Sequence, residues 1–190
     1  MRGRFLLAVF LAVALCFNVS AAENNEEAWE ALRDGRAVLM LRHALAPGTG
    51  DPGNFDLNDC STQRNLNDVG REQARAWKPF LADHGITEAR VFSSQWCRCM
   101  DTATGMNMGE VTEWPSLNSF FRNRGDGPTQ TRQTITLVNQ LEEGAPVILV
   151  SHQVNITGLT GIFPSSNEGA IIALPLSEDP TVLARVSPGR

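Results

Sequence analysis

The stretch VLMLRHALAPG, residues 38–48, decides the fold and raises the first question about function. It begins with a continuous apolar run, which is typical of a strand buried on both faces of a parallel sheet. The run ends at Arg42 and His43, two residues that can bind or attack an anion, and then passes into a loop. In open α/β sheets the ligand site lies beyond the carboxyl ends of the strands. The Arg-His pair therefore marks a candidate site at that edge of the sheet.

The rest of the chain alternates between strand-like and helix-like segments. Strands are expected at residues 37–42, 89–94, 145–152, 169–177 and 181–187, with a weaker strand near 110–114. Helices are expected at residues 26–35, 67–85, 95–106, 129–144 and 153–161. This alternation predicts an α/β fold, a three-layer α/β/α sandwich with a mostly parallel central sheet.

Residues 1–22 are expected to be a signal peptide and not part of the folded domain. Two arginines open the segment, an apolar run follows, and small residues allow cleavage after Ala21 or Ala22. The apolar run is short for a membrane span, so an uncleaved anchor is the weaker alternative and no stable membrane insertion is expected after cleavage. The prediction is a single exported domain, residues 23–190, that is periplasmic or secreted.

The charge of this domain argues against nucleic acid as a partner. Residues 1–22 hold two arginines and no acids, so 14 Lys and Arg remain against 21 Asp and Glu, a formal charge of −7. Nucleic acids and anionic membranes select basic surfaces. The remaining residues show no repeat or low-complexity linker and are numerous enough for one domain with its own core. The sequence leaves the oligomeric state open.

Three cysteines remain after residue 22: Cys60, Cys97 and Cys99. In an oxidising compartment an odd number suggests one disulfide and one buried thiol. A metal site is the competing interpretation, but Cys97 and Cys99 are closer in sequence than the usual pair of metal ligands, and no histidine is near them. We therefore expect no metal and no cofactor.

Polar residues also follow the second and third strong strands. Arg98 comes shortly after the second, and His152 ends the third. A single histidine at a strand end is more often a boundary residue than a catalytic one. Here two of the three histidines, His43 and His152, fall at equivalent strand ends, which favours a shared site. The third, His84, is expected to cap the end of a helix.

Four segments carry a resemblance to a known family: LRHA at 41–44, NLNDVGREQA at 65–74, VFSSQWCRCMDTA at 91–103 and VILVSHQVN at 147–155. Together and in this order they resemble the histidine phosphatase superfamily, whose fold is phosphoglycerate-mutase-like. The resemblance implies that His43 attacks phosphorus and carries the phosphoryl group. It also implies that Arg42 and Arg98 clamp the phosphate oxygens and that His152 adds a further donor.

The resemblance implies an activity as well. Such a site would make the protein an exported, metal-independent phosphoric monoester hydrolase of the histidine acid phosphatase type. Its substrate would be a small or lipid-linked phosphomonoester, hydrolysed through a phosphohistidine intermediate. The alternative is a non-catalytic protein that binds a phosphate ligand on the same fold. A purely structural domain would leave the four matching segments unexplained.

Two features depart from the family's pattern. Ala44 stands where the family usually has glycine, so its backbone has to adopt a φ that alanine tolerates. The general acid that protonates the leaving oxygen has no evident candidate, because Gln153 replaces the aspartate of one branch and the segment 117–123 offers no carboxylate. Glu113 and Asp126 are nearby carboxylates, and each is expected to be a solvated surface charge.

The expected site also indicates how the cysteines pair. Cys60 lies in the long polar loop 44–66, and Cys97 directly precedes Arg98. Loops of this length inside a compact domain are usually functional. A Cys60–Cys97 disulfide would hold this loop beside the phosphate site and leave Cys99 as a buried thiol.

Overall fold

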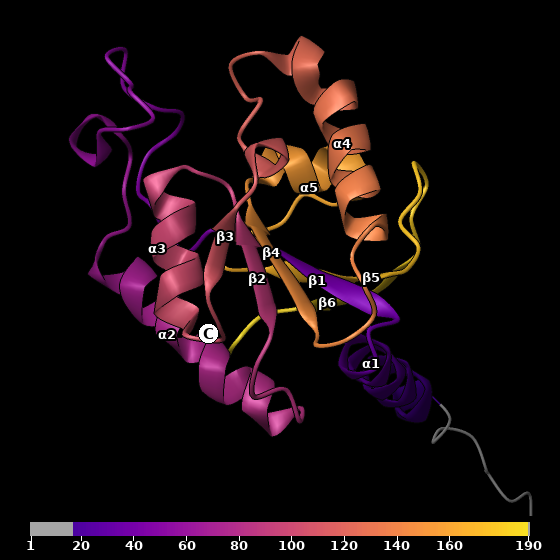
Figure 1. Cartoon of the computed structure of the whole chain (residues 1–190). Helices are drawn as coiled ribbons and strands as arrows, with labels where there is room; N and C mark the ends of the chain where they lie inside the picture. Colours follow the sequence, from indigo (N-terminus) through magenta and orange to yellow (C-terminus); the bar gives the residue numbers. More distant parts are fainter. Residues whose placement is uncertain (1–16, 190) are drawn as a thin grey trace, which may run out of the picture.

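The computed structural model describes residues 17–189, which contain a six-stranded sheet with the strand order β3-β2-β4-β1-β5-β6 (Figure 1). The strands are β1 (Ala37–Arg42), β2 (Arg90–Ser93), β3 (Val111–Glu113), β4 (Val147–Ser151), β5 (Gly169–Ala173) and β6 (Val182–Val186). The pairs β1–β4, β2–β4 and β2–β3 are parallel, whereas β5 is antiparallel to both β1 and β6. The other five strands of this sheet therefore run in one direction and β5 runs opposite to them. This confirms the predicted mostly parallel sheet.

Helices cover both faces of this sheet. They are α1 (Phe17–Arg33), α2 (Asp68–Asp83), α3 (Cys97–Met106), α4 (Gly127–Asn139) and α5 (Gln153–Thr160). Successive side chains of a strand point to opposite faces. Leu39 and Leu41 of β1 belong to the core that α1, α2 and α3 form on one face, and Val38 and Met40 to the core under α4 and α5 (Figure 1). The predicted three-layer sandwich is therefore confirmed.

The helix α2 shows how local sequence signals set the bounds of an element. The side chain of Asn67 caps its start by accepting a hydrogen bond from the backbone N–H of Gly70 at 2.8 Å. Trp77 lies on its inward face and is fully buried in the core. His84 lies at the C-terminal cap, as expected, and Gly85 then adopts a φ of +77°, which glycine tolerates best.

The helix α1 is longer than the helix expected from the sequence. It spans Phe17–Arg33, so that residues 17–22 of the predicted signal peptide continue the helix that packs on the sheet. The segment before the expected start contains alanine and glutamate, which favour helix. Residues 1–16, the rest of the predicted signal peptide, lie outside the described residues. Within residues 17–189, no helix combines the length and the apolar character that crossing a membrane requires.

The parallel register brings three strand ends to one edge of the sheet. Arg42 pairs with Ser151 across β1 and β4, and the backbone N–H of His43 donates to the carbonyl of Ser151 at 2.9 Å. On the other side of β4, the backbone N–H of Ser94, just beyond β2, donates to the carbonyl of Val150 at 2.9 Å. The segments that follow β1, β2 and β4 therefore emerge next to one another.

Candidate active site

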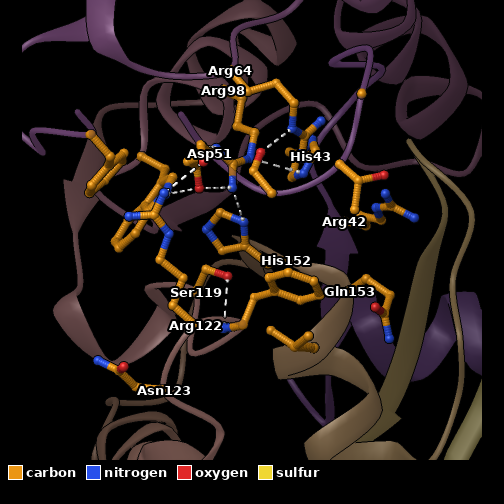
Figure 2. A pocket seen from close by; sticks show the side chains of 17 residues that line it. Arg42, His43, Asp51, Arg64, Arg98, Ser119, Arg122, Asn123, His152 and Gln153 are labelled. Carbon is orange, nitrogen blue, oxygen red and sulfur yellow. Dashed lines mark hydrogen bonds and ion pairs between the residues drawn. The ribbon is translucent and has the colours of Figure 1, made fainter. Parts of the chain in front are cut away.

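A pocket of about 330 Å³ opens at this edge and is lined by all four residues to which the sequence analysis assigned chemistry (Figure 2). Arg42 ends β1 and His43 follows it, Arg98 belongs to the first turn of α3, and His152 is the N-cap residue of α5. His43, Arg98 and His152 are at most 3% exposed, whereas Arg42 is partly exposed. Buried polar groups need partners, so their contacts define what the site can do.

The contacts of His43 fix which ring nitrogen carries the proton and which carries the lone pair. Its Nδ1 lies 2.7 Å from the carbonyl oxygen of Ala44, which can only accept, so Nδ1 carries the proton and Nε2 carries the lone pair. The Nε of Arg98 donates to that Nε2 at 3.2 Å. Burial and then the charge of Arg98 hold the pKa of His43 well below its usual value. His43 is thus a neutral imidazole that lines the pocket, with the lone pair of its Nε2 directed at Arg98.

The same reasoning assigns the tautomer of His152. Its Nδ1 accepts a hydrogen bond from Nη2 of Arg98 at 3.3 Å, so the proton is on Nε2, which donates to Oγ of Ser94 at 2.9 Å. The hydroxyl of Ser94 in turn donates to Oδ1 of Asn118 at 3.1 Å. Burial and then Arg98 lower the pKa of His152. A chain of oriented hydrogen bonds therefore holds this second imidazole beside the first.

A carboxylate that is absent from the sequence-based predictions completes the surroundings of Arg98. Oδ1 of Asp51 lies 2.6 Å from Nη1 of Arg98, and the indole N–H of Trp96 donates to Oδ2 at 3.1 Å. Burial would raise the pKa of Asp51, but the hydrogen bond and charge of Arg98 outweigh it and lower this pKa. Asp51 is therefore ionised in the pocket.

Arg42 and Ala44 continue the chain on either side of His43. Nη1 of Arg42 donates to the carbonyl of Pro164 at 3.0 Å, while its buried Nε has no hydrogen-bond partner within the described residues. A phosphate oxygen is the kind of acceptor that this arginine lacks. Ala44 is buried, and its backbone N–H donates to Oγ1 of Thr102 at 3.0 Å. Its φ is not positive. Alanine at this position therefore causes no backbone strain.

Two more arginines, also absent from the sequence-based predictions, hold the loop over the pocket. Arg64 donates to the carbonyls of Gly50, at 2.8 Å, and of Ala46. Burial lowers the pKa of Arg64 to about 10, so it stays charged at neutral pH. Arg122 donates to the carbonyls of Asp51 and Pro52, each at 2.6 Å. Their sequence signal is weak, because an arginine in a loop is usually a solvated charge.

The predicted Cys60–Cys97 disulfide is present, with a Cα–Cα distance of 5.8 Å. It ties the loop 44–66 to the first turn of α3, next to Arg98, and in the chain-entropy model such a link contributes about 3 to 4 kcal/mol. Cys99 is a buried free thiol, as predicted, and burial raises its pKa to about 12. Across residues 17–189, no three His, Cys, Asp or Glu residues gather in a way that would hold a metal ion.

Neither Gln153 nor the nearby carboxylates of Glu113 and Asp126 are placed to act as a general acid. The side chain of Gln153 donates to Oγ1 of Thr157 at 2.8 Å and turns away from His43 (Figure 2). Glu113 is exposed and accepts from the side chain of Gln95 at 3.1 Å, and Asp126 is exposed as well. Neither of these carboxylates lines the pocket.

Comparisons with known proteins agree with this geometry. The family model of the histidine phosphatase superfamily (branch 1) matches residues 38–134. A search of curated proteins by sequence finds no match. Many solved structures share the fold.

Three solved structures illustrate the similarity. The protein histidine phosphatase SixA complexed with tungstate is 19% identical, with 80% of this chain and 97% of that chain covered and a TM-score of 0.58. The mycobacterial glucosyl-3-phosphoglycerate phosphatase Rv2419c in complex with VO3 is 17% identical, with 77% and 96% covered and a TM-score of 0.56. A mutant phosphoserine phosphatase from Entamoeba histolytica in complex with phosphoserine is 14% identical, with 78% and 95% covered and a TM-score of 0.54.

At these identities the solved structures establish a common fold. The family model goes further, because it extends over just over half of the 190 residues and includes Arg42, His43 and Arg98. His152 lies beyond the matched segment and is brought to the site by the parallel pairing of β1 with β4. This chain belongs to the histidine phosphatase superfamily (branch 1).

Proposed function

We propose that the protein is a metal-independent phosphatase, a phosphoric monoester hydrolase of the histidine acid phosphatase type, that works through a phosphohistidine on His43. The observation that carries the proposal is the unprotonated Nε2 of His43, which accepts a hydrogen bond from Nε of Arg98 at 3.2 Å, with the ring of His152 5.5 Å away between centroids. A neutral imidazole is suited to attack phosphorus, and the arginines beside it are suited to stabilise the charge on the phosphoryl oxygens.

The reaction has two steps. In the first, the lone pair of Nε2 attacks phosphorus, the Nε2–P bond forms, and the bond from phosphorus to the leaving group breaks with its electron pair. In the second, water attacks phosphorus, the Nε2–P bond breaks, and inorganic phosphate and neutral His43 are released. Arg42 and Arg98 bind the phosphoryl oxygens throughout. The known structures with tungstate, VO3 and phosphoserine support an oxyanion ligand for this fold.

The proposed place of action is outside the cytoplasm, in the periplasm or secreted. The Cys60–Cys97 disulfide supports this place, because such bonds persist in oxidising compartments. The predicted signal peptide, residues 1–22, would direct the chain there. The substrate would be a small or lipid-linked phosphomonoester, or a phosphoryl group on a better leaving group.

An aryl phosphate assay tests this function directly. The protein without residues 1–22 is incubated with p-nitrophenyl phosphate, and both phosphate release and a phosphoprotein stable to alkali and labile to acid are measured. We expect both signals in the absence of added metal. Phosphate binding without either signal would favour the second candidate, a non-catalytic phosphate-binding protein, which the absence of a placed general acid supports.

The rate is expected to depend steeply on the pKa of the leaving group. A leaving oxygen that receives no proton departs with much of its negative charge, and proton donation is worth roughly 10² to 10⁴ in rate. Aryl phosphates should therefore react far faster than alkyl phosphates. A phosphorylated nitrogen would be another suitable group, in line with the similarity to a protein histidine phosphatase.

The measurement is the rate of the phosphorylation step over a series of phenyl and alkyl phosphates. Glu113→Gln and Asp126→Asn are measured beside the parent protein, and neither is expected to change the slope because both residues are exposed and lie outside the pocket lining. A shallow slope in the parent that becomes steep in either variant would identify that residue as an acid and contradict the prediction.

A further inference from the structure

Asp51 is held in one orientation deep in the pocket. Its side chain is 10% exposed and pairs with the 3% exposed side chain of Arg98. Its two oxygens face Nη1, at 2.6 Å, and Nη2, at 3.3 Å, and the indole of Trp96 adds a third donor at 3.1 Å. Asp51 has no role in the two-step reaction proposed above.

The carboxylate contacts only one edge of the guanidinium. Nη1 and Nη2, which form the end of the group, face Asp51. Nε and Nη2, which form its side, face Nε2 of His43 at 3.2 Å and Nδ1 of His152 at 3.3 Å. Figure 2 shows the guanidinium between Asp51 and the two imidazoles. Because Nη2 carries two hydrogens, it serves both edges.

We propose that Asp51 is a positioning residue for phosphoryl transfer, an inference that rests on the proposed function. By holding the end of Arg98, Asp51 directs the Nε–Nη2 side at His43 and His152, beside the position that the proposed mechanism gives to the transferred phosphoryl group. Donors stabilise the transition state most when they are fixed before the reaction begins. The planar guanidinium of Arg98 is fixed in this way only if another group holds its Nη1–Nη2 end.

The loop that carries Asp51 is itself fixed. Arg64 donates to the carbonyl of Gly50, and Arg122 donates to the carbonyls of Asp51 and Pro52. The same loop is linked to α3 by the Cys60–Cys97 disulfide described above. The carboxylate therefore has a rigid support from which to orient Arg98.

Two other roles for Asp51 agree less well with these contacts. As the general acid, Asp51 would need a proton, but its bond with Arg98 lowers its pKa and keeps it ionised. A carboxylate that competes with phosphate would contact the Nε–Nη2 side of the Arg98 guanidinium, which faces the histidines. Asp51 contacts the Nη1–Nη2 end instead. Both roles nonetheless make distinct predictions.

The test compares Asp51→Asn with the parent and with Glu113→Gln, a carboxylate outside the pocket. Asp51→Asn should lower kcat for p-nitrophenyl phosphate about 10- to 100-fold, since a small misplacement of a catalytic group has effects of this size. The Kd of inorganic phosphate, measured by calorimetry, should change by less than about threefold, because a loss in the transition state alone appears in kcat. The slope of the leaving-group series should not change.

A double-mutant cycle shows whether Asp51 acts through Arg98. In the Arg98→Ala background, Asp51→Asn should lower kcat no further, whereas a merely structural role would lower it in both backgrounds. A steeper leaving-group slope in Asp51→Asn would assign Asp51 as the acid. Tighter phosphate binding with unchanged kcat would assign it as a competitor. Each of these three results would overturn the proposal.

A spectroscopic measurement keeps the two proposals separable. If the parent protein shows neither turnover nor a phosphohistidine, the proposed function is wrong. The effect of Asp51 on the orientation of Arg98 can still be measured in that case. The Nε–H signal of Arg98 in a ¹H–¹⁵N spectrum, assigned by its absence from Arg98→Lys, should be protected from exchange in the parent and lost in Asp51→Asn. An unchanged signal in Asp51→Asn would contradict the role of Asp51 whether or not the protein is an enzyme.

Discussion

Replacing His43 with alanine is expected to abolish turnover of p-nitrophenyl phosphate, with a fall in kcat of at least about 10⁴-fold. The reason is that, in the proposed mechanism, Nε2 of His43 forms the bond to phosphorus, and the variant lacks this atom. The phosphoprotein signal should vanish together with turnover. Both quantities are measured on the same preparation, by phosphate release and by trapping with labelled substrate.

The His43→Ala variant should still bind inorganic phosphate, since Arg42 and Arg98 remain. His84→Ala is the matched control, because His84 lies at the end of α2 and does not line the pocket. It should keep both turnover and the phosphoprotein. Turnover of His43→Ala at the parental rate would rule out a covalent mechanism through this residue.

Replacing Arg98 with alanine is expected to lower kcat/KM about 10³-fold and to weaken phosphate binding. Arg98 contacts both imidazoles and the Asp51 carboxylate, so no other arginine of the pocket can take over its contacts. The variant should also be less stable by about 1 to 3 kcal/mol, because it leaves the partly buried carboxylate of Asp51 without its charged partner. Urea unfolding and calorimetry with phosphate measure the two effects separately.

The double variant Asp51→Asn with Arg98→Ala separates stability from catalysis. Removing the carboxylate charge should restore part of the stability, whereas turnover should stay as low as in Arg98→Ala. Parental phosphate binding by a folded Arg98→Ala protein would show that Arg98 is no part of the anion site.

Much of the fold and four of the residues that line the pocket follow from sequence patterns. The apolar run before Arg42 identifies a strand buried on both faces, and Asn67 and Gly85 mark the bounds of α2. The two strand-end histidines meet because parallel pairing brings the carboxyl ends of β1 and β4 to one edge. The strand, the helix bounds and the strand-end histidines can be predicted because each depends on the residue pattern of a short segment.

The loop between β1 and α2 could not be read in the same way. Asp51, Asp56 and Asp59 all lie in it, and nothing in their local sequence says that Asp51 alone of the three reaches Arg98. Its position depends on contacts between distant residues, such as those of Arg122 with the loop carbonyls. The helix α1 also begins at Phe17, before the expected residue 26.

The order of the strands also bears on how the protein folds. β1, which delivers His43, lies between β4 and β5, and its contacts with both join residues more than 100 positions apart in the sequence. The entropy cost of closing such long loops has to be met before strand pairing contributes any stability. Topologies of this kind therefore fold slowly. A nascent chain that ends at residue 146 already contains His43 and Arg98, yet it has neither neighbour of β1. Until the last quarter of the chain emerges, this apolar strand is unpaired and open to aggregation, and His43 lacks the neighbours that β4 and α5 later provide.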